Sequence, residues 1–439
     1  MPADDVLTLA DKLWRGEIEI GVGPGRHHPF GHDGRLAEIG DGADHGVAFV
    51  PSFANVSAFA TGDGLVLVDT GSAPLARIVH GLVRGWSTLP LHTAVYSHGH
   101  IDHVFGVPVF EEEAAAQGWR APRVVAHEAL PARFDRYVLT HGYNEVVNRR
   151  QFQLPELRWP TEYRYPDETY RDVLPLDVGG VRFELHHAKG ETDDHTWTWI
   201  PERRVLCCGD LFIWASPNAG NPQKVQRYPR EWAQALREMA GLGAEVLLPG
   251  HGFPVVGAAR VRQALDDTAT LLESLVDQTL AMMNAGARLD EIVHSVRAPA
   301  PLLERPYLRP IYDEPEFVVR NIWRLYGGWY DGNPATLKPA PDAAVAREVA
   351  ALAGGAEALA RRGLAVADGP GDGPGGLRLA AQLVEWAALA DPSSAFVQRA
   401  RADVYGRRAE AEASTMARGV FSWAASESRR AAGDPPDPA

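Results

Sequence analysis

Cysteine is nearly absent from this chain. The only two in 439 residues, Cys207 and Cys208, are neighbours in an apolar stretch. Adjacent cysteines in an apolar stretch are usually small buried side chains. With only two cysteines, a fold held together by several disulfide bonds is excluded. Long apolar runs are also absent, because none reaches the ~18 residues that a membrane-spanning helix needs. The acidic residues 1–5 lack the apolar segment of a signal peptide. We therefore expect a cytoplasmic protein without a membrane partner.

Lysine is scarce as well, occurring only at positions 12, 189, 224 and 338, so arginine supplies most of the positive charge. The formal net charge of −14 argues against nucleic acid as a partner. Any anionic ligand must therefore bind in a local basic pocket. The hydrophobic content of 45% is that of a globular protein, and 439 residues exceed one average domain.

The most informative segment is 97–103, Ser-His-Gly-His-Ile-Asp-His, which holds four potential metal ligands: His98, His100, Asp102 and His103. Imidazoles together with a carboxylate suit Zn²⁺ or a similar metal. The segment follows an apolar run, 93–96, that predicts a buried strand. On a tight loop after this strand, the ligands can face two metals roughly 3.5–4 Å apart.

Four further segments occur in a characteristic order. They are 65–71 (Leu-Val-Leu-Val-Asp-Thr-Gly), 189–196 (Lys-Gly-Glu-Thr-Asp-Asp-His-Thr), 208–211 (Cys-Gly-Asp-Leu) and 248–252 (Leu-Pro-Gly-His-Gly). With segment 97–103, this series resembles the metallo-β-lactamase superfamily. The resemblance implies that Asp210 supplies a carboxylate shared by two metals and that His251 supplies the last imidazole.

Glu191 departs from the usual pattern, because most members of that superfamily have a histidine there. A glutamate at this position is typical of the type III alkylsulfatase branch. The resemblance therefore implies one metal held by His98, His100 and Glu191, and a second held by Asp102, His103 and His251, with Asp210 shared. His187, four residues upstream of Glu191, remains an alternative ligand for the first metal.

The segment 311–335 also resembles that branch. It contains Val-Val-Arg-Asn-Ile-Trp-Arg-Leu-Tyr-Gly-Gly-Trp-Tyr-Asp-Gly-Asn-Pro, which is similar to the opening of the alkylsulfatase dimerisation domain. The resemblance implies a homodimer. We expect no sterol-carrier-like domain after it, which puts the handling of long lipid-like tails in doubt.

Periodicity predicts the order of the elements. Strands are expected at 47–50, 55–60, 65–69, 93–96, 181–186, 196–200, 204–208 and 245–248. Helices are expected at 3–14, 73–85, 106–117, 126–153, 229–240, 258–284, 288–296, 316–326, 341–363, 376–390, 394–408 and 409–431. The fold class is therefore α+β, an αββα metallo-β-lactamase sandwich followed by an all-α dimerisation domain. The predicted domains are 1–257 (catalytic), 258–432 (helical) and 433–439 (a disordered tail).

The predicted chemistry is metal-assisted hydrolysis. Asp102 and Asp210 are the candidate catalytic residues, because either carboxylate can orient a water or take its proton. A sulfate monoester stays anionic, so basic and polar side chains must surround its oxygens, and arginine matches them well. Two segments offer such groups, and the candidate substrate-binding residues are Tyr143, Asn148, Arg149, Lys224 and Arg227. His195 is a candidate for hydrogen bonding to a ligating carboxylate.

These observations predict a dinuclear zinc hydrolase that cleaves a small anionic alkyl sulfate ester to an alcohol and sulfate. We expect two Zn²⁺ per chain, with Mn or Fe as alternatives in one site. The family resemblance suggests attack on carbon with cleavage of the C–O bond. Two other functions remain open: another hydrolase of the same fold (a lactonase, thioesterase or phosphodiesterase), and a non-catalytic metal-binding oligomer.

Overall fold

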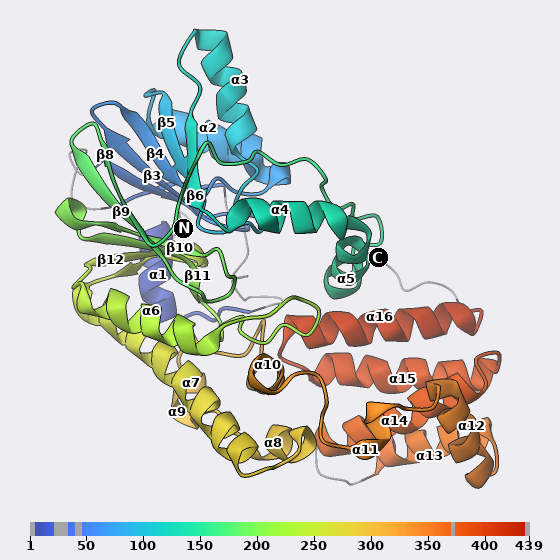
Figure 1. The fold of residues 1–439 in the computed structure, drawn as a ribbon. Coiled ribbons are helices and arrows are strands. Elements are labelled where there is room, and N and C mark those ends of the chain that lie inside the picture. Colours follow the sequence, from blue (N-terminus) through green and yellow to red (C-terminus); the bar gives the residue numbers. More distant parts are fainter. Residues whose placement is uncertain (1–4, 22–33, 40–45, 370–373, 435–439) are drawn as a thin grey trace. The chain divides into compact units, whose positions relative to one another are not determined.

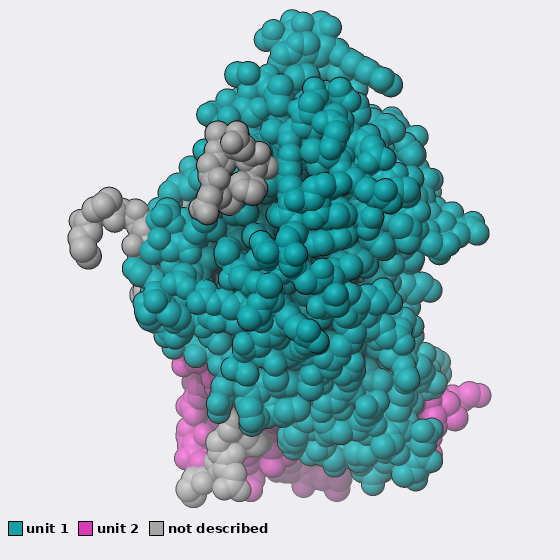
Figure 2. All heavy atoms as spheres, turned by 90° about the vertical axis from the view of Figure 1, so that its left-hand side faces the viewer, with its two compact units in different colours: residues 1–141, 160–329 teal, residues 142–159, 330–439 magenta. Residues whose placement is uncertain are grey.

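The computed structural model describes residues 5–21, 34–39, 46–369 and 374–434. The chain forms two compact units, which Figure 2 shows in different colours. The first comprises residues 1–141 and 160–329, and the second comprises 142–159 and 330–439.

Two β-sheets form the centre of the first unit (Figure 1). One contains, in spatial order, β1 (Ala37–Glu38), β2 (Val47–Val50), β3 (Val56–Thr61), β4 (Gly64–Val68), β5 (Leu91–Val95), β6 (Arg123–His127) and β7 (Glu168–Tyr170). The other contains, again in spatial order, β13 (Val255–Val256), β12 (Val246–His251), β11 (Val205–Ile213), β10 (Thr196–Ile200), β9 (Val181–His187) and β8 (Val173–Val178). The pairs from β4 to β7 are parallel, as is β11 with β12, whereas the other pairs are antiparallel.

Successive side chains of the first sheet point to its two faces in turn, and an apolar core covers each face. In β2, Val47 and Phe49 belong to the core that also contains Phe183 of the second sheet. Ala48 and Val50 point the other way, into the core formed with helices α2 and α3. Because successive side chains of a strand point to opposite faces, a fully apolar strand such as β2 must be covered on both sides.

Helices cover the outer faces of both sheets (Figure 1). On the first sheet these are α2 (Ala76–Trp86) and α3 (Val107–Gln117), and on the second α6 (Pro229–Gly241) and α7 (Ala258–Asn284). The remaining helices of this unit are α1 (Val6–Trp14), η1 (Ala73–Leu75), α4 (Leu130–Leu139), η2 (Pro201–Arg203), α8 (Leu289–Ser295), α9 (Ala300–Leu303) and α10 (Pro315–Gly327). The layer order helix, sheet, sheet, helix confirms the predicted αββα sandwich.

The second unit is helical in its described residues, as the fold prediction required. It contains α5 (His141–Phe152) from Gly142 onward, α11 (Pro334–Leu337), α12 (Asp342–Leu352), α13 (Ala356–Asp368), α14 (Pro374–Ala390), α15 (Ala395–Ala411) and α16 (Thr415–Ala431). Its apolar core joins α12 to α15 through side chains such as Leu359, Val384 and Val404. None of the helices described in the chain has the length and hydropathy needed to cross a bilayer.

Two predicted helical stretches are each divided into two helices in the structure. The stretch 126–153 begins inside strand β6 and then forms two helices, α4 and α5. The expected helix 341–363 is interrupted between α12 and α13, where Gly354 and Gly355 have φ angles of 88° and 116°. These left-handed conformations suit glycine and end a right-handed helix.

The compact units do not divide at the boundary predicted after residue 257. Helix α7 packs along α6, and its Leu265 and Leu272 belong to the same core as strand β11. Ile322 of α10 is part of that core as well, so the first unit continues to residue 329. Of the tail predicted at 433–439, residues 435–439 lie outside the described part, and Asp434 accepts hydrogen bonds from Arg399.

Candidate metal centre

The loop that follows β5 carries the His-x-His-x-Asp-His motif, and Asp69 fixes its shape. Asp69 follows strand β4 and has a φ of 59°. Its carboxylate accepts hydrogen bonds from the Ser97 N–H at 2.7 Å and the Ser97 hydroxyl at 2.8 Å. It also lies 2.7 Å from Nδ1 of His103. A carboxylate can only accept in this pair, so His103 is protonated at Nδ1 and turns Nε2 toward the other candidate ligands.

The first group of candidate ligands is His98, His100, Glu191 and Asp210. Oε2 of Glu191 lies 3.3 Å from Nε2 of His98 and 3.3 Å from Nδ1 of His100. Oδ2 of Asp210 lies 3.8 Å from Nε2 of His98. Residues from the β5 loop, the β9–β10 loop and strand β11 thus meet at one point.

The second group is Asp102, His103 and His251. Oδ2 of Asp102 lies 3.6 Å from Nε2 of His103 and 3.5 Å from Nε2 of His251. Asp210 reaches this group too, with Oδ1 at 3.4 Å from His103 and Oδ2 at 3.3 Å from His251. Asp210 therefore lies between the two groups, with carboxylate oxygens facing both.

These residues fit a pair of divalent cations. Metal–ligand bonds of about 2.0–2.2 Å in a tetrahedral site place ligand atoms about 3.3–3.6 Å apart, close to the separations given above. Nε2 of His103, Oε2 of Glu191 and Oδ1 of Asp210 are buried and have no hydrogen-bond partner among the described residues. Buried polar atoms nearly always have a partner, and a cation would supply one here.

Burial and neighbouring charges set the ionisation of the ligands. Burial lowers the pKa of His100 to about 4, which keeps this imidazole neutral. Burial opposes the charge on Glu191, but His100 and Arg227 hold its pKa well below the usual value. Burial also opposes the charge on Asp210, whose pKa His251 and His103 lower. Burial lowers the pKa of His103 and His251, but nearby carboxylates outweigh it and raise both pKa values. Metals bind the neutral imidazole, so these two histidines release a proton when a metal binds.

Glu191 has two partners besides the imidazoles. The side-chain amide of Asn218 donates to its Oε1, and Arg227 donates from Nη1 to its main-chain carbonyl. Nη2 of Arg227 lies 3.5 Å from Oε1 as well. His187, the alternative ligand, lies elsewhere: its Nδ1 is 3.0 Å from the His195 carbonyl, and its ring stacks on His127 at 3.6 Å.

Other buried side chains hold the ligand loops in place. Asp194 accepts from the Gly99 N–H at 2.8 Å and from Nε of Arg133 at 2.7 Å. Nε2 of His195 accepts from the Asp210 N–H at 3.1 Å, so this histidine contacts the main chain of a candidate ligand and not its carboxylate. The Asn55 amide donates to the carbonyls of Pro249 and Gly252 at 2.9 and 3.0 Å, which fixes the loop around His251.

Gly250, in the Pro-Gly-His-Gly segment, leaves room for Asp210. A Cβ at position 250 would overlap Oδ1 of Asp210 and approach the Gly209 carbonyl carbon to 2.8 Å. Any larger residue would therefore displace the carboxylate that lies between the two groups.

The candidate substrate-binding residues belong to different units. Lys224 and Arg227 lie in the first unit on the irregular segment between β11 and α6. Burial lowers the pKa of Lys224 to about 8, with Arg227 adding to the effect and Asp102 and Glu191 opposing it. Lys224 is thus within electrostatic reach of both ligand groups.

Tyr143, Asn148 and Arg149 lie on α5 in the second unit. The Arg149 guanidinium binds Glu145 and the Leu157 carbonyl, both at 2.8 Å. The Asn148 amide donates to the Asn144 carbonyl at 2.7 Å. Tyr143 is exposed. Within their own unit, Arg149 and Asn148 thus have local partners.

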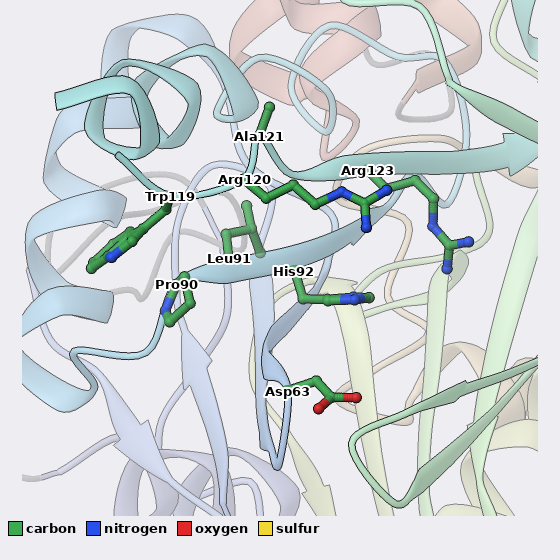
Figure 3. A pocket seen from close by; sticks show the side chains of 8 residues that line it. All are labelled: Asp63, Pro90, Leu91, His92, Trp119, Arg120, Ala121 and Arg123. Atoms are coloured by element: carbon green, nitrogen blue, oxygen red, sulfur yellow. The ribbon is translucent and has the colours of Figure 1, made fainter. Parts of the chain in front are cut away.

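A separate hollow of about 270 Å³ lies at the other end of strand β5 (Figure 3). Leu91, which begins β5, and Arg123, which begins β6, line it together with His92 and Trp119. The candidate ligands of the 98–103 loop follow the opposite end of β5, and no predicted site residue lines this hollow.

Comparison with known families agrees with this geometry. Residues 50–251 match the family model described as the metallo-beta-lactamase superfamily. Residues 288–431 match the model described as alkyl sulfatase dimerisation. The second match begins just before α8 in the first compact unit and continues into the helical unit.

Among curated proteins, a linear primary-alkylsulfatase of Pseudomonas sp. is 30% identical over 319 residues, covering 67% of this chain and 59% of that protein. The alkyl/aryl-sulfatase BDS1 of Saccharomyces cerevisiae is 27% identical over 354 residues, covering 74% of this chain and 53% of that protein. This chain thus spans between about half and three fifths of the length of these relatives.

Among solved structures, the stereoselective inverting sec-alkylsulfatase Pisa1 from Pseudomonas sp. has the same fold. The TM-score is 0.78 at 23% identity, and the match covers 92% of this chain and 66% of that one. From the two family matches and these relatives, we conclude that this chain combines a metallo-β-lactamase domain with an alkyl sulfatase dimerisation domain and is homologous to the alkylsulfatases.

Proposed function

We propose that this protein hydrolyses alkyl sulfate esters to an alcohol and sulfate at a dinuclear metal centre. The observation that carries the proposal is the position of Asp210, whose carboxylate oxygens face both ligand groups at 3.3–3.8 Å. The imidazole and carboxylate donors suit two zinc ions, and Mn or Fe in one site is compatible with the carboxylates.

The choice of a sulfate ester rests on the relatives and on local charge. Three relatives that are 27–30% identical have the names of alkylsulfatases, primary, secondary or alkyl/aryl. The chain as a whole is acidic, with a formal net charge of −14, so an anionic substrate needs a local cation. Lys224 is the candidate within electrostatic reach of Asp102 and Glu191. Arg227 has a different main task, because it binds Glu191.

When two divalent cations are bound, they supply Lewis acidity and make a neighbouring water more acidic. The residues of the chain do the rest. Asp102 and Asp210 orient the attacking water and take up its proton. Lys224 holds the sulfate group, while Asn218 and Arg227 hold Glu191 in place. Asp69 keeps the proton of His103 on Nδ1 and leaves Nε2 free for the metal side.

We propose that the water attacks carbon. The new C–O bond then forms to the water oxygen, and the ester C–O bond breaks with its electron pair leaving on sulfate. The relative Pisa1 is described as an inverting sec-alkylsulfatase, and inversion requires that bonds be made and broken at the carbon itself. Hydrolysis in ¹⁸O-water tests this step: we expect the label in the alcohol, and label in the sulfate alone would contradict attack on carbon.

We also propose that the protein is a cytoplasmic homodimer. The match of residues 288–431 to a dimerisation family supports the homodimer. The cytoplasmic location remains an expectation from the sequence. The alternative functions, another hydrolase of this fold or a non-catalytic metal-binding protein, are separated from the proposal by the following experiment.

The test compares metal content with turnover in the purified full chain. We expect about two metal ions per chain by mass spectrometry of the metals, and hydrolysis of dodecyl and hexyl sulfate but not of a lactone, a thioester or bis-p-nitrophenyl phosphate. His98→Ala removes a candidate ligand and should lower turnover more than about 100-fold. His294→Ala is the matched control, because His294 is exposed and its imidazole lies 3.5 Å from Asp290, the one ion-pair partner it has among the described residues. Full turnover by metal-free protein would contradict the metal mechanism, and hydrolysis of the lactone alone would support another hydrolase.

A further inference from the structure

The segment 218–227 is irregular, and half of its residues are buried. It connects β11 to α6 and contains no helix or strand. Asn218, Asn221 and Arg227 are nevertheless at most 6% exposed. A buried irregular segment needs hydrogen-bond partners for its backbone from elsewhere in the fold, and helix α10 with the turn before it provides several of them.

Asp313, just before α10, holds the first half of the segment. Its side chain is 0% exposed. Oδ2 accepts from the Gly220 N–H at 2.5 Å, and Oδ1 accepts from the Glu314 N–H at 2.8 Å. The contact is close, because a Cβ at Gly220 would overlap the main chain of Phe317 and Val318. One carboxylate therefore joins the segment to the first residues of α10.

Asn321, in the middle of α10, holds the second half. Its amide nitrogen donates to the Arg227 carbonyl at 3.1 Å, and its Oδ1 accepts from the Arg227 N–H at 3.3 Å. The same oxygen accepts from the Gln226 side-chain amide at 2.8 Å. The side chain thus satisfies both main-chain groups of Arg227, as a neighbouring strand would do.

The same segment carries the residues that face the candidate metal centre. Asn218 and Arg227, near the two ends, bind Glu191. Lys224 lies between the attachment points and is within electrostatic reach of Asp102 and Glu191. A shift of the segment against α10 would therefore move the Lys224 ammonium group together with Asn218 and Arg227, the two partners of Glu191.

We propose that Asp313 and Asn321 are positioning residues, through which α10 fixes segment 218–227 and so places Lys224 for the sulfate group of the substrate. This inference rests on the proposed function. It gives α10 a role in the active site of its own chain, although the helix lies in the region whose family model is named for dimerisation. Neither residue contacts a candidate ligand directly in the contacts described above, so both act through the segment.

The test uses the metal-loaded full chain and the variant Asn321→Ala. We expect faster hydrogen–deuterium exchange in residues 217–228, because the Arg227 N–H loses its acceptor. With dodecyl sulfate, KM should rise about tenfold while kcat changes less than about threefold, since the loss affects binding of the sulfate group. Metal content per chain should stay the same.

The matched control is Arg320→Ala on the same helix. Arg320 is half exposed, and in the described part of the chain its guanidinium pairs with Glu316 alone, at 3.3 Å, so exchange and KM should equal those of the wild type. Asn321→Gln retains the amide, so its KM should lie between that of the wild type and that of Asn321→Ala. Asp313→Asn keeps one acceptor oxygen and should accelerate exchange around Gly220 with a smaller rise in KM.

Two results would overturn the inference: unchanged exchange in 217–228, or faster exchange with a KM within twofold of the wild type. The second result would leave Asn321 a purely structural residue, visible only in a lower melting temperature. If the wild type does not hydrolyse sulfate esters at all, the proposed function fails. The attachment of the segment is then judged by the exchange experiment alone.

Discussion

Glu191 is 1% exposed and yet carries a charge. The buried charge depends on its partners, because burying an unpaired carboxylate costs much free energy. Two imidazoles lie at 3.3 Å from Oε2, and Asn218 and Arg227 bind Oε1 and the main chain. This arrangement predicts that one side of the carboxylate is held by the protein and the other faces a metal.

Glu191→Gln should therefore weaken one metal site while the fold survives. The substitution keeps the volume and one oxygen but replaces the other by an amide that cannot bind a cation. We expect the dissociation constant of the weaker-bound metal to rise more than about 100-fold, measured by titration of the metal-free protein with zinc.

His187→Ala is the comparison variant, because His187 was the alternative ligand. It contacts the His195 carbonyl and stacks on His127 but belongs to neither ligand group. The metal affinity of the His187→Ala variant should stay within about threefold of the wild-type value. A larger loss in His187→Ala than in Glu191→Gln would reverse the assignment of the first site.

The sequence was sufficient to choose the residues that meet at the centre. His98, His100, Asp102 and His103 are contiguous, and all seven predicted ligands lie in the two groups. It was not sufficient for the residues that hold them. Asp69 was noted only as part of a strand and turn, and Asp194 only as part of a motif. Their hydrogen bonds to Ser97 and Gly99 join residues 28 and 95 positions apart, and such long-range contacts have no periodic signal.

At the scale of elements, strands with a strong apolar run could be predicted from the sequence, and strands with a weak one could not. Strands β2 to β5 and β9 to β12 were expected within a few residues of their observed bounds. Strands β1, β6, β7, β8 and β13 were missed. In β8, Val173 and Pro175 are exposed while Leu176 and Val178 are buried, so the pattern is that of an edge strand with only a partial apolar face.

Helix α5 illustrates how one small residue permits an element to pack. It belongs to the same unit as α16, and Nε2 of Gln153 donates to the Gly419 carbonyl at 2.7 Å. A Cβ at Gly419 would overlap the Gln151 carbonyl oxygen and lie 3.0 Å from its Cα. We expect Gly419→Ala to force the two segments apart and lower the free energy of unfolding by about 1–3 kcal/mol, measured by thermal or urea unfolding.

Gly406→Ala on α15 is the matched control. A Cβ there meets no atom within 4 Å, and alanine is the better helix former by about 0.5–1 kcal/mol. This variant should be as stable as the wild type or more so. If Gly419→Ala were also neutral, the close contact between α5 and α16 would not exist in solution.

At the scale of the whole molecule, the core of the first unit includes residues that follow the last candidate metal ligand, His251, in the sequence. Leu265, Leu272 and Ile322, which come after His251 in the sequence, are fully buried in the core shared with both sheets. Residues 288–329 therefore belong to the first compact unit and also to the region that matches the dimerisation family. The boundary predicted at 257 rests on the change to helical patterns after Gly257, and the pattern of a helix does not show which core that helix joins.

The last prediction concerns assembly. The described residues of the second unit leave several large apolar side chains exposed, including Tyr143 (64%), Leu154 (51%) and Leu352 (89%). Exposed side chains of this kind suit a protein interface, and stable homodimers bury large apolar surfaces. We expect light scattering at micromolar concentration to give twice the chain mass of 47.8 kDa. Gly406→Ala, which changes no contact, should give the same mass. A single, fully active species with the mass of one chain would contradict the homodimer, whereas the metal centre, built within one unit, would be unaffected.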